Sequence, residues 1–202
     1  LSLPLDTPVI GTSAVEAGNQ MGAERPLERA AASVIAQAAQ AGTGADAALI
    51  EAKSAAAPIY KGDYTASDLN AVVADEKLYE AALTGAQLQD VFNDVILATT
   101  TYRYLDIEPV VDYPALAGLK AFLSADGTKS TLLLPDGETP DPDAVYRVVV
   151  SQTILAALTY LRSENAAAFS PLEATLQSTF REALAAGTLQ APAPYFEVEA
   201  AS

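Results

Sequence analysis

Apolar positions near the start of the chain follow the period of a helix. Between Pro26 and Gly42 they recur every three or four residues, which is the spacing of one helical face. Pro26 suits the first helical position, and Gly42 ends the run. The residues before Pro26 mix Pro, Gly, Ser and Thr with short apolar pieces. We therefore expect an extended lead-in over residues 1–22 and one folded domain over residues 23–202.

The middle of the chain alternates short apolar runs with capped helices. The runs predict strands, and two residue pairs have the spacing of a capping box, in which each side chain accepts from the other residue's backbone N–H. Apolar residues at helical spacing follow each box, so each box predicts a helix start. The predicted elements are strands over 46–50 and 78–83, a helix over 65–73 with the box Thr65/Asp68, and a helix over 84–98 with the box Thr84/Gln87.

Turn signals in the second half of the chain separate three more apolar runs. The pairs Asp126-Gly127 and Asp136-Gly137 are typical of hairpins, so these runs are predicted to form an antiparallel meander. Two helical patterns follow, the second with Ser170 as its cap. Helices and strands mix without strict alternation, which favours a single α+β domain. The predicted elements are strands over 116–124, 130–134, 146–150 and 195–198, and helices over 152–162 and 171–186.

The charge balance argues against two classes of partner. The chain has 11 Lys and Arg against 26 Asp and Glu, a net charge of −15, so its field repels phosphate backbones and anionic lipid headgroups. We expect no nucleic acid as a partner and no membrane insertion. The most continuous apolar run, over 148–161, is shorter than the roughly 20 residues that a membrane helix needs.

The chain contains neither Cys nor His, which removes most catalytic chemistry. Disulfides, thiolate metal sites, Ser-His-Asp and Cys-His catalysis and imidazole-held zinc are all excluded. We expect no catalytic residue, no metal and no cofactor, and we lean towards a protein that is not an enzyme. A Tyr-rich acidic loop over 99–114 is a candidate binding surface. The clustered carboxylates Asp136, Glu138, Asp141 and Asp143 lack EF-hand spacing and predict a solvated turn.

Four ordered blocks carry a resemblance to a known family. They are GADAALI (44–50), YKGDYTASDL (60–69), EAALTGAQLQDVF (80–92) and DGETPDPDAVYRVVV (136–150). Together they resemble the C-terminal domain of the 5'-nucleotidase family, the substrate-specificity domain of secreted and periplasmic nucleotidases. The resemblance implies the α+β fold of that domain and an extracytoplasmic location. It also implies that the catalytic metallophosphoesterase domain, whose metal ligands include several His, is not in these residues, so we expect a detached C-terminal domain or a stand-alone relative.

At the positions where the resemblance places the family's ligand-binding residues, this chain has different amino acids. After the first strand, Glu51 stands where the family has an Asn, Lys53 and Ser54 stand where it has two Gly, and Ala56 stands where it has an Arg. Leu78 and Thr153 stand where it has two aromatic residues that stack on the base. Residues 157–159 replace its Gly-Gly-Asp, and residues 28–30 replace its Gly-Asn-Leu. Losing one charged hydrogen bond to an anion costs about 1.5–3 kcal/mol of binding free energy. We therefore expect ordinary nucleotides to be poor ligands.

Three functional hypotheses follow from these observations. The leading one is a non-catalytic, exported interaction or assembly module that binds a protein partner or its own copies, with residues 1–22 as one route to assembly. The second is a small-molecule binding domain with a remodelled pocket. The third is the specificity domain of a nucleotide hydrolase whose catalytic domain is separate. The remodelled pocket of the second hypothesis would be lined by Glu51, Lys53, Ser54, Ser151 and Gln152.

Overall fold

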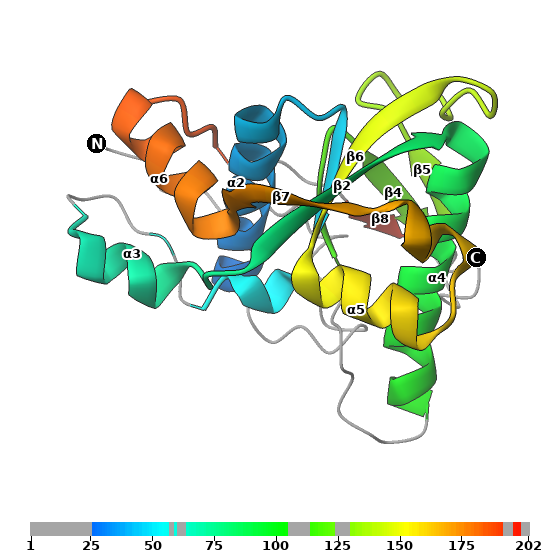
Figure 1. The fold of residues 1–202 in the computed structure, drawn as a ribbon, viewed down its shortest axis with the longest axis horizontal. Coiled ribbons are helices and arrows are strands. Elements are labelled where there is room, and N and C mark those ends of the chain that lie inside the picture. The colour runs from blue at the N-terminus through cyan, green and yellow to red at the C-terminus, as the bar shows by residue number, and fades with distance from the viewer. Residues whose placement is uncertain are drawn as a thin grey trace.

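The structure is a computed structural model that describes residues 26–56, 59, 64–104, 114–123, 130–191 and 196–198. Within these residues it has five α-helices, two 3₁₀ helices (η) and eight strands in two sheets (Figure 1). The lead-in over residues 1–22 and most of the Tyr-rich loop lie outside the described residues. In chain order the elements are α2 (Pro26–Thr43), β1 (Ala47–Ile50), η1 (Ala52–Ser54), α3 (Ala66–Val72), β2 (Lys77–Thr84), α4 (Gly85–Tyr104), β3 (Ala115–Ala117), β4 (Lys120–Leu123), β5 (Ser130–Leu133), β6 (Val145–Ser151), α5 (Gln152–Tyr160), η2 (Glu164–Ala168), β7 (Ser170–Thr175), α6 (Leu176–Ala186) and β8 (Phe196–Val198).

The larger sheet has five strands in the order β3-β1-β6-β2-β7. Strands β1 and β6 are parallel, with Leu49 opposite Val150, while β3, β2 and β7 join antiparallel. The central strand β6 is rich in β-branched Val, and its residues 148–151 are fully buried. Such residues suit a strand that is covered on both faces. The predicted α+β class is confirmed.

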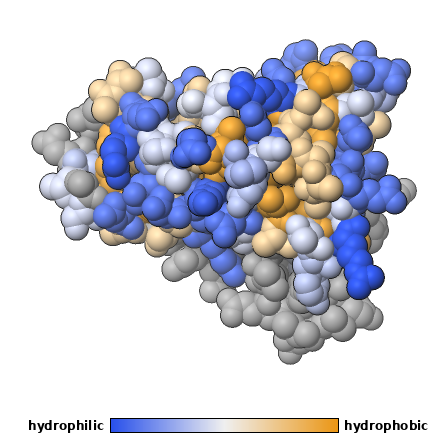
Figure 2. Space-filling view, viewed as in Figure 1, coloured by the Kyte–Doolittle hydropathy of each residue, from blue (hydrophilic) through white to orange (hydrophobic). Residues whose placement is uncertain are grey.

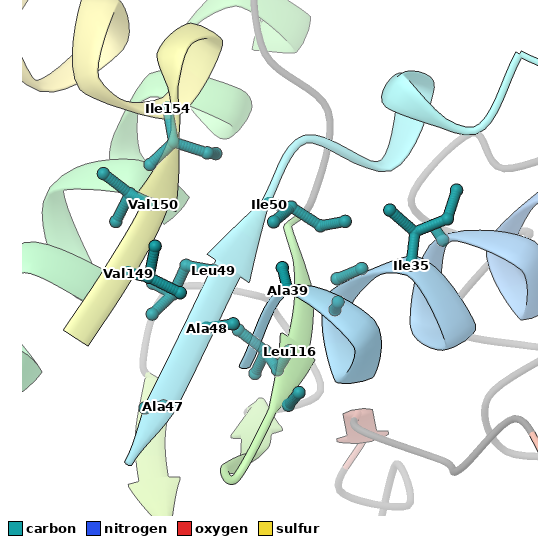
Figure 3. Close-up of a cluster of buried hydrophobic side chains, with 14 of the residues drawn as sticks. Ile35, Ala39, Ala47, Ala48, Leu49, Ile50, Leu116, Val149, Val150 and Ile154 are labelled. Carbon is teal, nitrogen blue, oxygen red and sulfur yellow. The ribbon is translucent and has the colours of Figure 1, made fainter. Parts of the chain in front are cut away.

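Helix α2 packs on the larger sheet at β1 and β3 and also contacts α6. Its buried face consists largely of Ala, with Val34 and Ile35. Ala has the highest helix propensity and lets the helix approach the strands closely. In Figure 3, α2 and β3 lie on one side of β1, and β6 with α5 lies on the other, so the labelled side chains form one continuous core. The predicted core-facing helix is confirmed.

Helix α4 connects the larger sheet to the smaller one, whose strand order is β5-β4-β8. Its predicted capping box is confirmed, because Thr84 N donates to Gln87 Oε1 at 2.9 Å and Gln87 N donates to Thr84 Oγ1 at 3.2 Å. On the smaller sheet, Leu132 N donates to Gln89 Oε1 at 2.9 Å. The helix continues to Tyr104, beyond the predicted end at residue 98.

The predicted meander over the second half of the chain is wrong. Among the strands that these three runs form, only β4 and β5 pair with each other as antiparallel neighbours, while β6 lies between β1 and β2 in the other sheet. The single strand predicted over 116–124 is divided at Gly118, which has a φ of +70°. A β-carbon there would collide with the carbonyl of Asp46, so the backbone can turn from β3 to β4 at this point only with glycine.

The helix predicted over 171–186 is also wrong in its first turn. Residues 170–175 form strand β7 on the open side of β2, and the helix begins at Leu176. The cap is Thr175, whose Oγ1 accepts from Ser178 N while its own backbone N donates to Ser178 Oγ. The Ser170/Glu173 pair has the spacing of a capping box, but pairing with β2 keeps this segment extended.

The predicted capping box of α3 is confirmed. Thr65 N and Thr65 Oγ1 both donate to Asp68 Oδ2 at 2.7 Å, and Asp68 N donates to Thr65 Oγ1 at 3.2 Å. The side-chain hydrogen bond from Thr65, aided by its backbone N–H, lowers the pKa of Asp68 below its ordinary value. The predicted last strand is confirmed as β8, which pairs in parallel with β4.

Candidate functional site

Polar residues gather where the two parallel strands of the larger sheet end. Strand β1 ends at Ile50 and β6 ends at Ser151, and their register places these two ends side by side. Glu51 N donates to Ser151 Oγ at 3.1 Å in a buried environment. Glu51 and Ser151 are 3% and 0% exposed. This hydrogen bond therefore joins the segment after β1 to the last residue of β6.

The turn that follows β1 is built around Glu51. Its side-chain Oε1 accepts from Lys53 N at 3.2 Å and caps the 3₁₀ helix η1. Ser54 ends η1 and is 1% exposed. The backbone then pairs with the end of α3, because Ala56 N donates to Val72 O and Ala74 N donates to Ser54 O. The turn is thereby fixed against the segment that leads into β2.

Glu76, just before β2, links three segments through one carboxylate. Its Oε1 accepts a short hydrogen bond from Ser54 Oγ, and its Oε2 accepts from Thr153 N at 3.1 Å and from Thr153 Oγ1 at 2.9 Å. Thr153 lies in the first turn of α5. A carboxylate is stabilised there by the unpaired N–H groups and positive end of the helix dipole. We call Glu51, Ser54, Glu76, Ser151 and Thr153 the strand-end network.

The structure brings together three of the five residues predicted for a remodelled pocket. Glu51, Ser54 and Ser151 are buried and belong to the strand-end network. The side chain of Lys53 is exposed, and Gln152 is exposed on α5. No observation tests whether these five residues bind a ligand, so that hypothesis stays a prediction.

Sequence reasoning missed Glu76 as a member of the site. It lies in the charged stretch Asp75-Glu76-Lys77, which has the composition of an ordinary solvated loop. Its partners are 22 and 77 residues away along the chain. No signal in the sequence marks Glu76, because only the structure shows that Ser151 makes no side-chain cap bond and leaves the cap of α5 to another segment.

The part of the strand-end network around Glu76 consists of donors that converge on one carboxylate. The three hydrogen bonds to Glu76 come from one backbone N–H and two hydroxyl groups, all of which donate to the carboxylate. These hydrogen bonds hold the turn after β1 and the first turn of α5 to the residue before β2. Across the described residues, no group of three or more potential ligands is arranged to hold a metal ion.

An open groove of about 430 Å³ lies on the outer side of α5, next to β2. Five of its lining residues are on α5 at helical spacing, and the sixth is on β2. None of the six is Asp, Glu, Lys or Arg. The lining residues are Tyr79, Gln152, Leu155, Ala156, Thr159 and Tyr160. Gln152 is the one predicted pocket residue that lines this groove, which we call the α5 groove.

The predicted solvated turn at residues 136–143 is observed. Asp136 Oδ1 accepts from Glu138 N, and Asp141 Oδ1 accepts from Asp143 N, each at 3.0 Å. All four carboxylate residues are exposed. Such Asx-type contacts are the usual way in which Asp stabilises a turn.

Comparison with known proteins identifies the fold family. The family model described as "5'-nucleotidase, C-terminal domain" matches residues 9–159. The chain belongs to this family. No curated protein sequence matches it. The matched residues include the ends of β1 and β6, where the strand-end network lies, and the whole of β2.

Solved structures of larger proteins contain the same fold. A putative 5'-nucleotidase from Staphylococcus aureus, in complex with alpha-ketoglutarate, has a TM-score of 0.66 at 16% identity and covers 98% of this chain. The 5'-nucleotidase precursor from Thermus thermophilus has 0.62 at 19% identity over 85%, and the NAD nucleotidase from Haemophilus influenzae has 0.63 at 15% over 84%. The matched regions are 40%, 35% and 33% of those three chains, respectively. At these identities the likeness shows the fold alone.

Proposed function

We propose that this chain is a non-catalytic interaction module that keeps the fold of a nucleotidase C-terminal domain without its ligand site. The proposal depends chiefly on one observation, the three-way contact of Glu76. In the family, ligand residues follow the first strand, precede the next strand and follow the YRVVV strand. Here Ser54, Glu76 and Thr153 occupy those three segments, and Ser54 and Thr153 both donate to the Glu76 carboxylate.

Two further features support the loss of nucleotide binding. The carboxylate of Glu76 occupies the N-terminal end of α5, which is a place where a helix can otherwise bind an anion. A phosphate brought to the same place would meet a negative charge in a chain of net charge −15. The proposed role is therefore recognition of another protein surface.

The proposed location is outside the cytoplasm, as in the secreted and periplasmic nucleotidases that the family comprises. In the part of the chain that the structure describes, no helix has both the length and the apolar character to cross a bilayer. The proposed partner is a protein, either a different chain or a second copy of this one.

The test is a ligand panel measured by thermal unfolding. A ligand present at about one hundred times its Kd adds about 2.7 kcal/mol to the free energy of unfolding. For a chain of this size, that should raise Tm by several degrees. AMP, adenosine, UDP-glucose and N-acetylglucosamine at about 1 mM would therefore reveal any Kd below about 10 µM. We expect no saturable rise in Tm for any of them.

Each positive result contradicts the proposal in a different way. A saturable rise with AMP or UDP-glucose would favour the specificity domain of a nucleotide hydrolase. A rise with a neutral sugar or nucleoside alone would favour a remodelled small-molecule pocket. Loss of that rise in a Gln152→Ala variant would place the ligand at the remodelled pocket, because Gln152 is one of its predicted lining residues.

A further inference from the structure

The outer edge of β5 bonds to a helix side chain instead of a further strand. Among the described strands, β5 is the last of the smaller sheet and pairs with β4 alone, while helix α4 packs beside it (Figure 1). In a strand, the N–H and C=O groups of every second residue point to the same edge. Leu132 N and Ser130 O both bond to α4, so they belong to the edge that faces away from β4. Such an edge is where an extended chain can add as a further strand.

Gln89 of α4 bonds to this edge through both ends of its side-chain amide. Leu132 N donates to Gln89 Oε1 at 2.9 Å, and Gln89 Nε2 donates to Ser130 O at 3.4 Å. A residue of an added parallel strand would make the same two bonds, because it bonds to the C=O before and the N–H after the residue that it faces, here Thr131. The Gln89 amide therefore takes the place of one residue of a neighbouring strand.

Asn93, one turn further along α4, fixes the orientation of that amide. Gln89 Nε2 donates to Asn93 Oδ1 at 2.9 Å, and Ser130 Oγ donates to the same oxygen at 2.8 Å. The two hydrogens of Gln89 Nε2 then have two acceptors, and Gln89 Oε1 has a donor. The reversed amide would turn its NH₂ group towards the N–H of Leu132, so the network allows one orientation only.

We propose that Gln89 closes the outer edge of β5 against strand addition. Four hydrogen bonds among Gln89, Asn93 and β5 tie this edge to a helix of the same chain. An extended segment of another chain can pair there only after it displaces the Gln89 amide. An unprotected edge pairs with extended segments of many sequences, so its closure keeps such pairing from competing with selective contacts. The closure is a property of the folded domain and does not depend on the proposed interaction role.

The first measurement is amide hydrogen exchange of Gln89→Ala, with Gln87→Ala as the matched control. Gln87 caps the start of the same helix through Thr84, so its loss weakens α4 and leaves the bonds to β5 in place. We expect the N–H of Leu132 to exchange at least about fivefold faster in Gln89→Ala, the effect of one lost hydrogen bond. Thr131, whose N–H faces β4, is the internal reference and should change no more than in the control.

The second measurement is the rate of association in about 1 M NaCl, where the screening length is about 3 Å and repulsion between acidic copies is suppressed. At about 100 µM protein, we expect Gln89→Ala to form thioflavin T-positive assemblies at least about tenfold faster than the wild type or Gln87→Ala. Equal rates for the two variants would attribute association to a weaker helix and overturn the proposal. Unchanged exchange at Leu132, or no association of Gln89→Ala, would overturn it as well.

A lysine on β5 tests whether this edge is the site of association. Thr131 is exposed, and Lys is a side chain by which natural proteins protect sheet edges. Adding Thr131→Lys to Gln89→Ala should return the association rate to within about twofold of the wild type. The added Lys lowers the net negative charge, so repulsion between copies cannot explain the slower association.

Exposed hydrophobic residues are the competing site of association. Figure 2 shows such residues near β2, β6 and β7 in the centre of that view. Val145, at the start of β6, is 65% exposed, and Val145→Lys makes the same charge change there. Association that Val145→Lys suppresses and Thr131→Lys leaves unchanged would assign it to that region and overturn the proposal. None of these results alters the outcome of the ligand panel, so the proposed loss of nucleotide binding is judged separately.

Discussion

At the scale of single residues, Glu76 has the most connected side chain of the candidate site. It accepts hydrogen bonds from Ser54 and Thr153, which lie on different segments. A hydrogen bond to a charged group contributes about 1.5–3 kcal/mol, more than a neutral one. The half-buried position of Glu76 reduces this contribution, because water competes for the same carboxylate.

Removing the charge of Glu76 should destabilise the fold. Glu76→Gln keeps the shape of the side chain. It replaces one carboxylate oxygen, which accepts a hydrogen bond, with an NH₂ group, which would face a donor. We expect a loss of about 1–2 kcal/mol in the free energy of unfolding, measured by urea denaturation as a lower midpoint with an unchanged slope. Asp75→Asn is the matched control: this exposed neighbour should change stability by at most about 0.5 kcal/mol. Equal urea midpoints for the two variants would show that the hydrogen bonds of Glu76 do not stabilise the fold.

At the scale of elements, the junction of β7 and α6 shows how sheet pairing overrides a local helix signal. Residues 170–175 carry a cap-like pattern, yet Glu80 pairs with Ser170 and Lys77 pairs with Thr175 across β2 and β7. Backbone N–H and C=O groups that already hydrogen-bond to a neighbouring strand would gain no further hydrogen bond if the helix began earlier. The helix therefore begins where pairing with β2 ends.

The two alternative caps of α6 can be compared directly. Thr175→Ala removes the acceptor of Ser178 N at 3.1 Å and should cost about 1 kcal/mol of unfolding free energy. Ser170→Ala removes the cap that the sequence predicted, and should cost at most about 0.5 kcal/mol, because Ser170 is exposed on β7. Urea denaturation of both variants shows which substitution lowers the free energy of unfolding more. A larger loss for Ser170→Ala would mean that α6 begins earlier.

At the scale of the whole molecule, the dominant feature is an excess of negative charge, carried by a chain that folds around an apolar core. The chain has 26 acidic and 11 basic residues. Among the described residues, the strand pair β2–β6 carries the ion pair of Arg147 with Glu80 at 2.7 Å. Arg147 is about half exposed, so the pair adds little stability and leaves the overall repulsion in place.

Salt should therefore stabilise the monomer. Between about 0.01 M and about 0.15 M NaCl the screening length falls from about 30 Å to about 8 Å, which weakens repulsion among the carboxylates. We expect Tm to rise over this range and then to level off, measured at micromolar protein so that association does not contribute. Sucrose, which is uncharged, controls for general solute effects. A fall in Tm with salt would show that attractive ion pairs outweigh repulsion.

Local patterns in the sequence determined several elements of this protein. The Ala-rich helix α2, the capping boxes Thr65/Asp68 and Thr84/Gln87 and the turn at 136–143 all depend on residues close together in the chain. The ordered family blocks also indicated the fold, and the absence of His and Cys excluded whole classes of chemistry.

Only the tertiary structure decided the features that depend on distant partners. The division of one predicted strand at Gly118, the strand β7 and the cap of α5 by Glu76 each require contacts between segments far apart in sequence. The sequence named Glu51, Ser54 and Ser151 as pocket residues, but their burial beside one another followed from the parallel alignment of β1 and β6. Local chemistry sets which conformations a segment can adopt, and long-range hydrogen bonding and burial select among them.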